Sequence, residues 1–253
     1  MIVDIHSHVL PGLDDGAPSM EEAILLTENA AANGVTHIIA TPHLNDKYRN
    51  HAKQIKEAVA DLNKELFRKR IPVDIFPGQE VQFFSCLNAL GDGHLLTLAD
   101  GGKYLLIELP DDHFPEFTFE LLFSLQIEGY IPIIPHPERN VVLRKEKQLL
   151  YELVTKGVLL QVTANSLFGA NGRTAKKCSL ELIKHNLVHF ISSDAHHPIQ
   201  RPFLLREGYQ FIERKFSTNL RNYFIENAKH VLQGTDFQPL PPISFKHTRA
   251  YKR

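Results

Sequence analysis

This chain of 253 residues carries histidines and carboxylates directly after several short apolar segments. The first segment runs into Asp4-Ile5-His6-Ser7-His8. In an extended strand, the side chains of His6 and His8 point to the same side of the backbone. A lone pair of this kind is weak evidence, because two hydrogen-bonded core histidines give the same pattern. Imidazole is also the commonest metal ligand, so the positions of the other histidines decide between the two interpretations.

Five later apolar segments end in the same residue types. They run into Thr41-Pro42-His43, Gly78-Gln79-Glu80, Ile107-Glu108, His136-Pro137-Glu138-Arg139 and Ser193-Asp194-Ala195-His196. A carboxylate such as Glu108 is costly at the end of an apolar strand unless it is paired or binds a metal. With one aspartate from the loop after the first segment, the nitrogen and oxygen donors are His6, His8, Asp15, His43, Glu80, Glu108, His136, Asp194 and His196.

These donors are too many for one ion, so the pattern predicts a site for two or three ions. Mixed imidazole and carboxylate ligation suits manganese, iron or zinc, and magnesium is a further alternative. Arg139 and Arg201 each follow a proposed ligand by a few residues, and a guanidinium group matches the oxygen atoms of a phosphate. We therefore expect metal-assisted hydrolysis of a phosphoester. The alternative for Arg139 is a structural salt bridge, for example with Glu138 or Glu108.

The two cysteines do not fit nucleophilic catalysis. A cysteine phosphatase needs an arginine shortly after its cysteine, whereas the sixth residue after Cys86 is Asp92 and the sixth after Cys178 is Lys184. The sequence also lacks a Walker loop and a Gly-x-Gly-x-x-Gly motif. We expect both cysteines to be small core residues.

Short β-branched segments alternate with helical patterns along the chain, which is typical of α/β folds with a parallel sheet. Strands are predicted over residues 2–5, 36–40, 73–76, 104–108, 131–134, 158–162 and 189–192. A capping box at Ser19 begins a helix that Gly34 ends, and further helices are predicted over residues 50–70, 117–128, 146–156, 174–186 and 219–232. Gly129 and Gly157 end two of them.

Seven such units fit a closed barrel better than an open doubly wound sheet, which stays the alternative. A barrel brings the carboxyl ends of its strands together, and so the proposed ligands. We expect a single-domain barrel over residues 1–238 and a C-terminal tail over residues 239–253.

Composition limits the remaining functions. The net charge of −1 argues against broad binding of nucleic acid or anionic lipid. Two cysteines are too few for a secreted disulfide framework, and neither a signal peptide nor a membrane span is predicted. We expect a cytoplasmic protein with no nucleic-acid partner.

The motifs resemble those of the PHP (polymerase and histidinol phosphatase) superfamily over nearly the whole chain. Within it, Leu10-Pro11-Gly12-Leu13-Asp14-Asp15-Gly16 and Gly129-Tyr130-Ile131-Pro132 are similar to the metal-dependent protein-tyrosine phosphatases of capsule and exopolysaccharide operons, the CpsB/YwqE type. The resemblance implies a distorted (β/α)7 TIM-like barrel and a three-metal site usually supplied with manganese. It also implies that the substrate is phosphotyrosine on the C-terminal tail of a bacterial tyrosine kinase.

Residue by residue, the resemblance assigns the metals to the nine donors and phosphate binding to Arg139 and Arg201. Asp14 competes with Asp15 for one ligand place. His196, His197 or an aspartate could act as general acid. A small phosphomonoester such as histidinol phosphate is the alternative substrate. A phosphodiester is disfavoured because the chain lacks a basic stripe, and a non-catalytic metal-bound adaptor is a distant third hypothesis.

Overall fold

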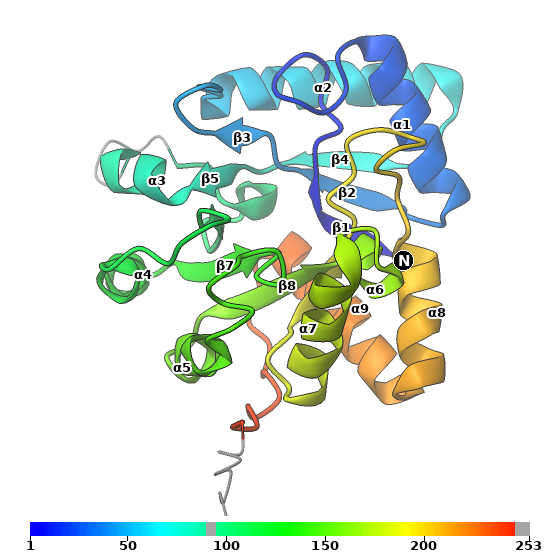
Figure 1. Ribbon diagram of the computed structural model, residues 1–253. Helices are drawn as coiled ribbons and strands as arrows, with labels where there is room; N and C mark the ends of the chain where they lie inside the picture. The colour runs from blue at the N-terminus through cyan, green and yellow to red at the C-terminus, as the bar shows by residue number, and fades with distance from the viewer. Residues whose placement is uncertain (90–94, 246–253) are drawn as a thin grey trace, which may run out of the picture.

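The computed structural model describes residues 1–89 and 95–245, and the strands that it contains are parallel (Figure 1). All seven predicted strands are present, and the α/β class is confirmed. Their bounds are β1 Val3–Ser7, β2 His37–Ala40, β4 Asp74–Pro77, β6 Tyr104–Glu108, β7 Ile131–Pro135, β8 Leu159–Thr163 and β9 Phe190–Ser192.

Two further short strands, β3 (His43–Leu44) and β5 (Glu80–Gln82), were not predicted. The chain after β2 and after β4 leaves one sheet and joins the other, which gives the strand orders β1-β2-β4 and β3-β5-β6-β7-β8-β9. Pro42, between β2 and β3, interrupts strand pairing because it has no N–H to donate to a neighbouring strand. Gly78, between β4 and β5, lies at a crowded place, where a Cβ would lie 2.7 Å from Cγ2 of Ile39. These breaks distort the barrel.

The barrel closes where β1 meets the chain that follows β9. Ser7 forms a parallel bridge with Ala195. The N–H of His8 donates to the carbonyl of Ala195 at 2.9 Å, and the N–H of Asp194 donates to the carbonyl of His6 at 2.9 Å. Closure therefore takes place among the predicted ligands.

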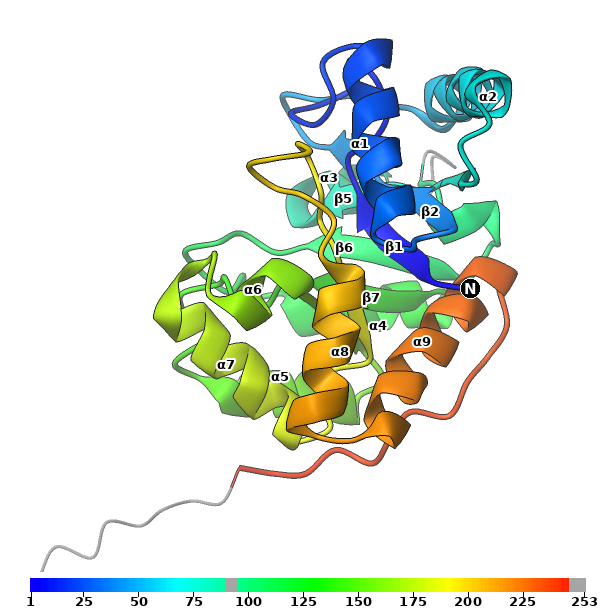
Figure 2. The same ribbon diagram turned by 90° about the vertical axis from the view of Figure 1, so that its right-hand side faces the viewer.

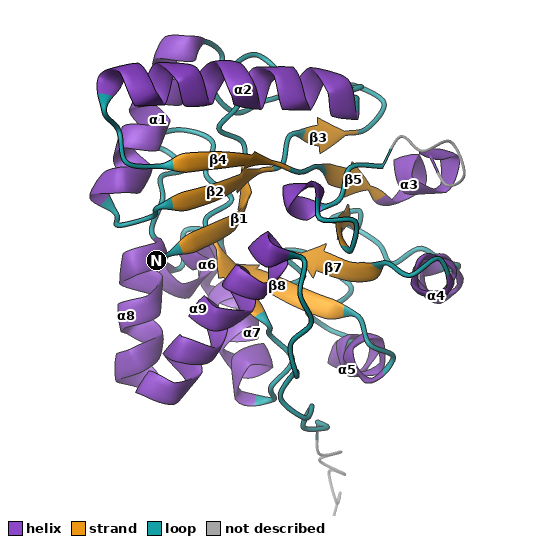
Figure 3. Ribbon diagram, turned by 180° about the vertical axis from the view of Figure 1, so that it is seen from behind, coloured by secondary structure: helices purple, strands orange, loops and turns teal. Residues whose placement is uncertain are grey.

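Helices surround the two sheets, with α1 and α2 over β1-β2-β4 and most of the others around the larger sheet (Figures 1 and 3). The six predicted helices are present as α1 Met20–Ala32, α2 Ala52–Lys69, α4 Thr118–Ile127, α5 Lys147–Thr155, α7 Gly172–Lys184 and α9 Thr218–Gln233. The Oγ of Ser19 accepts the N–H of Glu22 at 3.3 Å, as the capping box predicts. Gly129 and Gly157 have φ of +92° and +87°, which a helix end in the left-handed region requires.

Three helices and a 3₁₀ turn were not predicted: α3 Phe83–Ala89, α6 Ala164–Phe168, α8 Leu205–Lys215 and η1 Leu98–Asp100. Gly208 weakens the helical pattern of α8. In the structure a Cβ at this position would make an ordinary contact with Cβ of Ala164 on α6, at 3.4 Å, so crowding does not require the glycine. Figure 2 shows α8 beside α9.

Alternate residues of the strands enter two apolar clusters. Leu105 and Ile107 of β6 face the helices, whereas Tyr104 and Leu106 face the barrel interior. Val231 of α9 packs in the interior cluster. The amino-terminal end of the barrel is therefore filled by apolar side chains, and the polar cluster lies at the other end.

Two other expectations concern the cysteines and the C-terminal tail. Cys86 and Cys178 are buried as predicted, and burial raises the pKa of each thiol to about 12. In the predicted tail, the N–H of Ile243 donates to the carbonyl of His185 at 2.8 Å, while residues 246–253 lie outside the described part.

No helix in the described residues is long and apolar enough to cross a membrane.

Candidate metal centre

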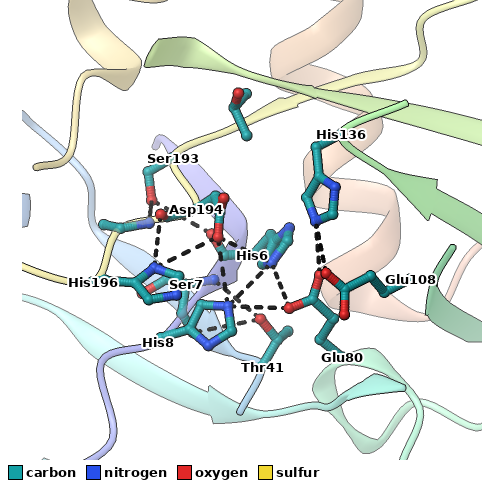
Figure 4. Close-up of polar contacts among 12 residues, drawn as sticks. His6, Ser7, His8, Thr41, Glu80, Glu108, His136, Ser193, Asp194 and His196 are labelled. Carbon is teal, nitrogen blue, oxygen red and sulfur yellow. Dashed lines mark hydrogen bonds and ion pairs between the residues drawn. The ribbon is translucent and has the colours of Figure 1, made fainter. Parts of the chain in front are cut away.

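One carboxylate oxygen, Oε2 of Glu80, lies among three imidazole rings at the carboxyl ends of the strands. Figure 4 shows Glu80 beside two of them, His6 and His8. It is 3.3 Å from Nε2 of His6, 3.2 Å from Nε2 of His8 and 3.1 Å from Nδ1 of His43. His6 and His8 point to the same side, as the strand period predicts, with their Nε2 atoms 3.3 Å apart. Glu80, His6 and His8 are buried.

A second carboxylate and a fourth imidazole extend this cluster. Oε1 of Glu80 is 2.9 Å from Nε2 of His136. The Glu108 carboxylate lies 3.7 Å from Nε2 of His136 and 3.8 Å from Nδ1 of His43. Glu108 thus has the partners that its position at the end of an apolar strand requires.

The two oxygens of Asp194 face different groups. Its Oδ1 lies 3.4 Å from Nε2 of His6, 3.5 Å from Nε2 of His8 and 3.6 Å from Nδ1 of His196. Its Oδ2 accepts from Nη2 of Arg139 and, at 2.8 Å, from Nη2 of Arg201. Asp194 therefore joins the imidazole cluster to both predicted phosphate-binding residues.

The adjacent aspartates Asp14 and Asp15 occupy different positions. Oδ1 of Asp15 lies 3.4 Å from Nε2 of His43 and 3.5 Å from Nε2 of His196, on the half-exposed side of the cluster. Oδ2 of Asp14 instead lies 2.6 Å from Nδ1 of His8 and accepts the N–H of His43 at 3.1 Å. Asp14 therefore orients the imidazole ring of His8 through its Nδ1, whereas Asp15 lies among the converging donor atoms.

The structure brings together all nine residues proposed as ligands. They form four overlapping groups whose donor atoms lie within 4.8 Å of one another: His8, Asp15, His43 and His196; His6, His8 and Asp194; His6, Glu80 and His136; His43, Glu80 and Glu108. Nδ1 of His43 is buried and lacks the geometry of a hydrogen bond despite its short distance to Glu80. A buried imidazole nitrogen that lies beside a carboxylate without a hydrogen bond fits a metal ion, although the ligand role of each residue stays a prediction.

The charges of the cluster balance one another. Burial alone would raise the pKa of Glu80, but His6 and His43 hold it well below its usual range. Burial alone would lower the pKa of His8, but Asp14 and Glu80 raise it well above its usual range. The Glu80 carboxylate thus stays ionised and requires positive charge beside it, which protons or metal ions supply. Burial and the neighbouring Glu80 raise the pKa of Glu108 instead.

His196 differs from the other rings. Burial and the neighbouring His8 lower its pKa to about 4, despite the opposing effect of Asp15. Its Nδ1 lies 3.0 Å from the carbonyl of Asp194. A neutral imidazole of this kind is suited to bind a cation through Nε2.

Several residues that orient the donors escaped sequence reasoning. Oε1 of Gln161 lies 2.9 Å from Nδ1 of His6. Asp4 accepts the N–H of Ser193 at 3.1 Å and also its hydroxyl, which fixes the loop that carries Asp194. Such contacts set the orientation of metal-binding rings. Gln161 and Asp4 are both polar residues inside buried apolar strands. The same signal identified Glu108, so it was available in the sequence for these two residues as well.

The backbone is unusual at two proposed ligands, because His136 and Asp194 have φ of +36° and +52°. Residues other than glycine rarely adopt this region, and they concentrate at functional sites when they do.

The arginines and His197 complete the rim of the cluster. Arg139 forms its ion pair with Asp194, not with the residues considered from the sequence. Glu138 instead accepts the N–H of Thr163 at 3.0 Å. Nδ1 of His197 accepts the N–H groups of Ile199 and Gln200, so it stabilises the turn before Arg201.

The sequence model of the capsular polysaccharide synthesis family CpsB/CapC matches residues 2–233 of this chain. The chain belongs to the CpsB/CapC family. Among CpsB/CapC relatives, the tyrosine-protein phosphatase YwqE of Bacillus subtilis is 40% identical over 99% of both chains. The putative tyrosine-protein phosphatase CapC of Staphylococcus aureus is 38% identical over 91% of both. The predicted family is confirmed.

Solved structures agree with this family assignment. A chain from the crystal structures of YwqE from Bacillus subtilis and CpsB from Streptococcus pneumoniae, described there as unique metal-dependent tyrosine phosphatases, matches with a TM-score of 0.93 and 40% identity. The match covers 97% of this CpsB/CapC chain and 100% of that one. Histidinol phosphate phosphatase from Lactococcus lactis matches with a TM-score of 0.51 at 14% identity over 96% and 97% of the two chains, which shows a shared fold.

Proposed function

We infer that this protein is a metal-dependent protein-tyrosine phosphatase of the CpsB/YwqE type, involved in capsule synthesis. The family match and the relatives named above support this activity. The observation that carries it is the position of Asp194, which links the cluster of donors to two guanidinium groups. A purely structural metal site would be closed and would not need arginines beside it, so the adaptor hypothesis loses its support.

We propose that the nine donors hold three ions, with manganese as the metal used in the cell. Mixed nitrogen and oxygen ligation supports manganese, iron or zinc over a purely oxygen-bound cation. Glu80 contributes to two of the donor groups, as do His6, His8 and His43, so neighbouring ions would share ligands. When bound, the ions supply positive charge and activate water for attack on phosphorus.

In this mechanism, Arg139 and Arg201 bind the phosphoryl oxygens and offset the charge that develops on them. Both guanidinium groups bond to Oδ2 of Asp194, which holds them on one side of the cluster. Their side chains are 23% and 39% exposed, so a phosphate can reach them. Each guanidinium has five N–H donors, so most remain for the substrate after the bond to Asp194.

The leaving group of phosphotyrosine is a phenol with a pKa near 10, which needs less protonation than an alkyl alcohol. We propose that His196 serves as a ligand of the metal centre and not as the acid that protonates the phenol, since its pKa of about 4 keeps the ring neutral and able to bind a cation. Cys86 and Cys178 take no part, because both thiols are buried and their pKa is raised to about 12.

We further propose that the substrate is the phosphorylated C-terminal tail of a bacterial tyrosine kinase, met in the cytoplasm. The resemblance to phosphatases of capsule operons supports this substrate. Residues 1–238 would form the catalytic barrel. The described part of the segment that follows contacts this barrel through Ile243 and Phe245, which both contact His185.

Phosphate release from a phosphotyrosine peptide tests the proposal. Metal-stripped protein should be inactive, and Mn²⁺ should restore release in the wild type but not in His136→Ala. The same assay with histidinol phosphate in place of the peptide tests the alternative substrate. Absence of release from the peptide by protein with bound metal would refute the tyrosine phosphatase assignment.

A further inference from the structure

A tight turn after β3 lies beside the metal centre. Leu44 and Arg49 form an antiparallel bridge at its base. The side-chain oxygen of Asn45 accepts the N–H of Lys47 at 3.0 Å and the N–H of Tyr48 at 2.9 Å. The N–H of Asn45 donates to the carbonyl of Tyr48 at 2.8 Å. These bonds fix the backbone of Tyr48 on both sides.

The Tyr48 ring is stacked against one of the proposed ligands. Its centroid lies 6.1 Å from that of His43, with 13° between the two planes. Nε2 of the same imidazole is 3.4 Å from Asp15, whose side chain is 49% exposed. Tyr48 is itself half-buried, and the ammonium of Lys47 lies 4.4 Å from the centre of its ring. A phenol ring in a fixed position therefore stands where the donor cluster opens to solvent.

We propose that Tyr48 is a specificity-determining residue whose ring contacts the phenyl ring of phosphotyrosine. The inference rests on the proposed function and adds the part of the site that recognises the aryl group. In phosphotyrosine, a single oxygen joins the phenyl ring to phosphorus. The ring must then lie among the residues that immediately surround the metal centre, and Tyr48 is one of them.

Aromatic rings attract one another in offset-stacked or edge-to-face arrangements with centroids 4.5 to 7 Å apart. Neither inorganic phosphate nor an alkyl phosphate can make this contact. The metal centre and the arginines bind the phosphoryl group of any such ligand. Tyr48 adds affinity only for the aryl esters.

The test compares wild type, Tyr48→Leu and Tyr48→Phe in the metal-loaded protein. The KM for a phosphotyrosine peptide and the inhibition constant of inorganic phosphate are measured for each. We expect Tyr48→Leu to raise KM about two- to tenfold with the inhibition constant of phosphate unchanged. Tyr48→Phe, which keeps the ring, should restore the wild-type KM. Tyr151→Leu, a half-buried tyrosine on α5, is the matched control and should change neither constant.

Two outcomes overturn the proposal. An unchanged KM in Tyr48→Leu means that the ring makes no contact with substrate. An equal rise in KM and in the inhibition constant of phosphate, or loss of metal in elemental analysis, means that Tyr48 only supports His43. Calorimetric binding of benzylphosphonate, which keeps one atom between the ring and phosphorus, against methylphosphonate measures the same contact without turnover. It therefore separates failure of this inference from failure of the phosphatase assignment.

Discussion

His189 offers a quantitative test of burial in this fold. The residue precedes β9 and is fully buried. Its Nδ1 accepts the N–H of Leu160 at 3.0 Å, while its Nε2 has no hydrogen-bond partner. Burial lowers its pKa to about 3, so the folded protein keeps this imidazole neutral. The unfolded chain, with an ordinary histidine pKa near 6.5, gains a proton as the pH falls below that value.

This difference makes folding less favourable in acid. Protonation of the unfolded state removes stability progressively between pH 6.5 and pH 3. With the folded pKa at about 3, the free energy of unfolding should fall by about 2 kcal/mol between pH 7 and pH 5 from this residue alone. His189→Asn places an amide oxygen near the position of Nδ1 and cannot titrate.

The assay is urea unfolding of metal-free wild type and His189→Asn at pH 7 and pH 5. The variant loses packing, so it should be less stable at pH 7. The difference between the free energies of unfolding of wild type and variant should then be about 2 kcal/mol smaller at pH 5 than at pH 7. Other titrating groups affect both proteins and cancel in this comparison. A gap that stays constant from pH 7 to pH 5 would refute the reasoning.

Three further predictions concern the site. Arg139→Ala should lower kcat/KM for a phosphotyrosine peptide about 100-fold without loss of metal, and metal loss in elemental analysis would exclude a role in phosphate binding. Asp14→Asn removes the carboxylate behind His8 and should weaken metal binding about 10- to 100-fold in calorimetric titration, whereas unchanged affinity would contradict a positioning role. Cys178→Ala should retain full phosphatase activity, because its thiol is buried and its pKa is raised; strong loss of turnover in a protein with normal metal content would reopen thiol catalysis.

The sequence was sufficient for the parts of this molecule that depend on local pattern. The seven strands were predictable because β-branched runs and helical patterns alternate. The convergence of the nine proposed ligands was predictable because polar residues at the ends of apolar strands are costly without partners. Parallel strands in a barrel then bring those ends together, as the donor groups show.

The sequence was insufficient where distant segments decide the structure. The change of sheet at Pro42 and Gly78 depends on which strands they meet, so β3 and β5 were missed. The different roles of Asp14 and Asp15 depend on the position of His8 and His43 relative to one loop. The pairing of both arginines with one carboxylate likewise became visible only in three dimensions.

The closure between β1 and the segment after β9 bears on how the protein is made. The backbone bonds of His6 and His8 to Asp194 and Ala195 join the two ends of the barrel. A ribosome releases His6 long before it adds His196. The growing chain therefore carries histidines that are buried in the folded protein. They have no complete metal centre to join until β9 and the segment after it have been made. Contacts so far apart in sequence also slow folding. Metal uptake should thus mark the end of barrel assembly, and fragments that stop before β9 should lack the complete centre.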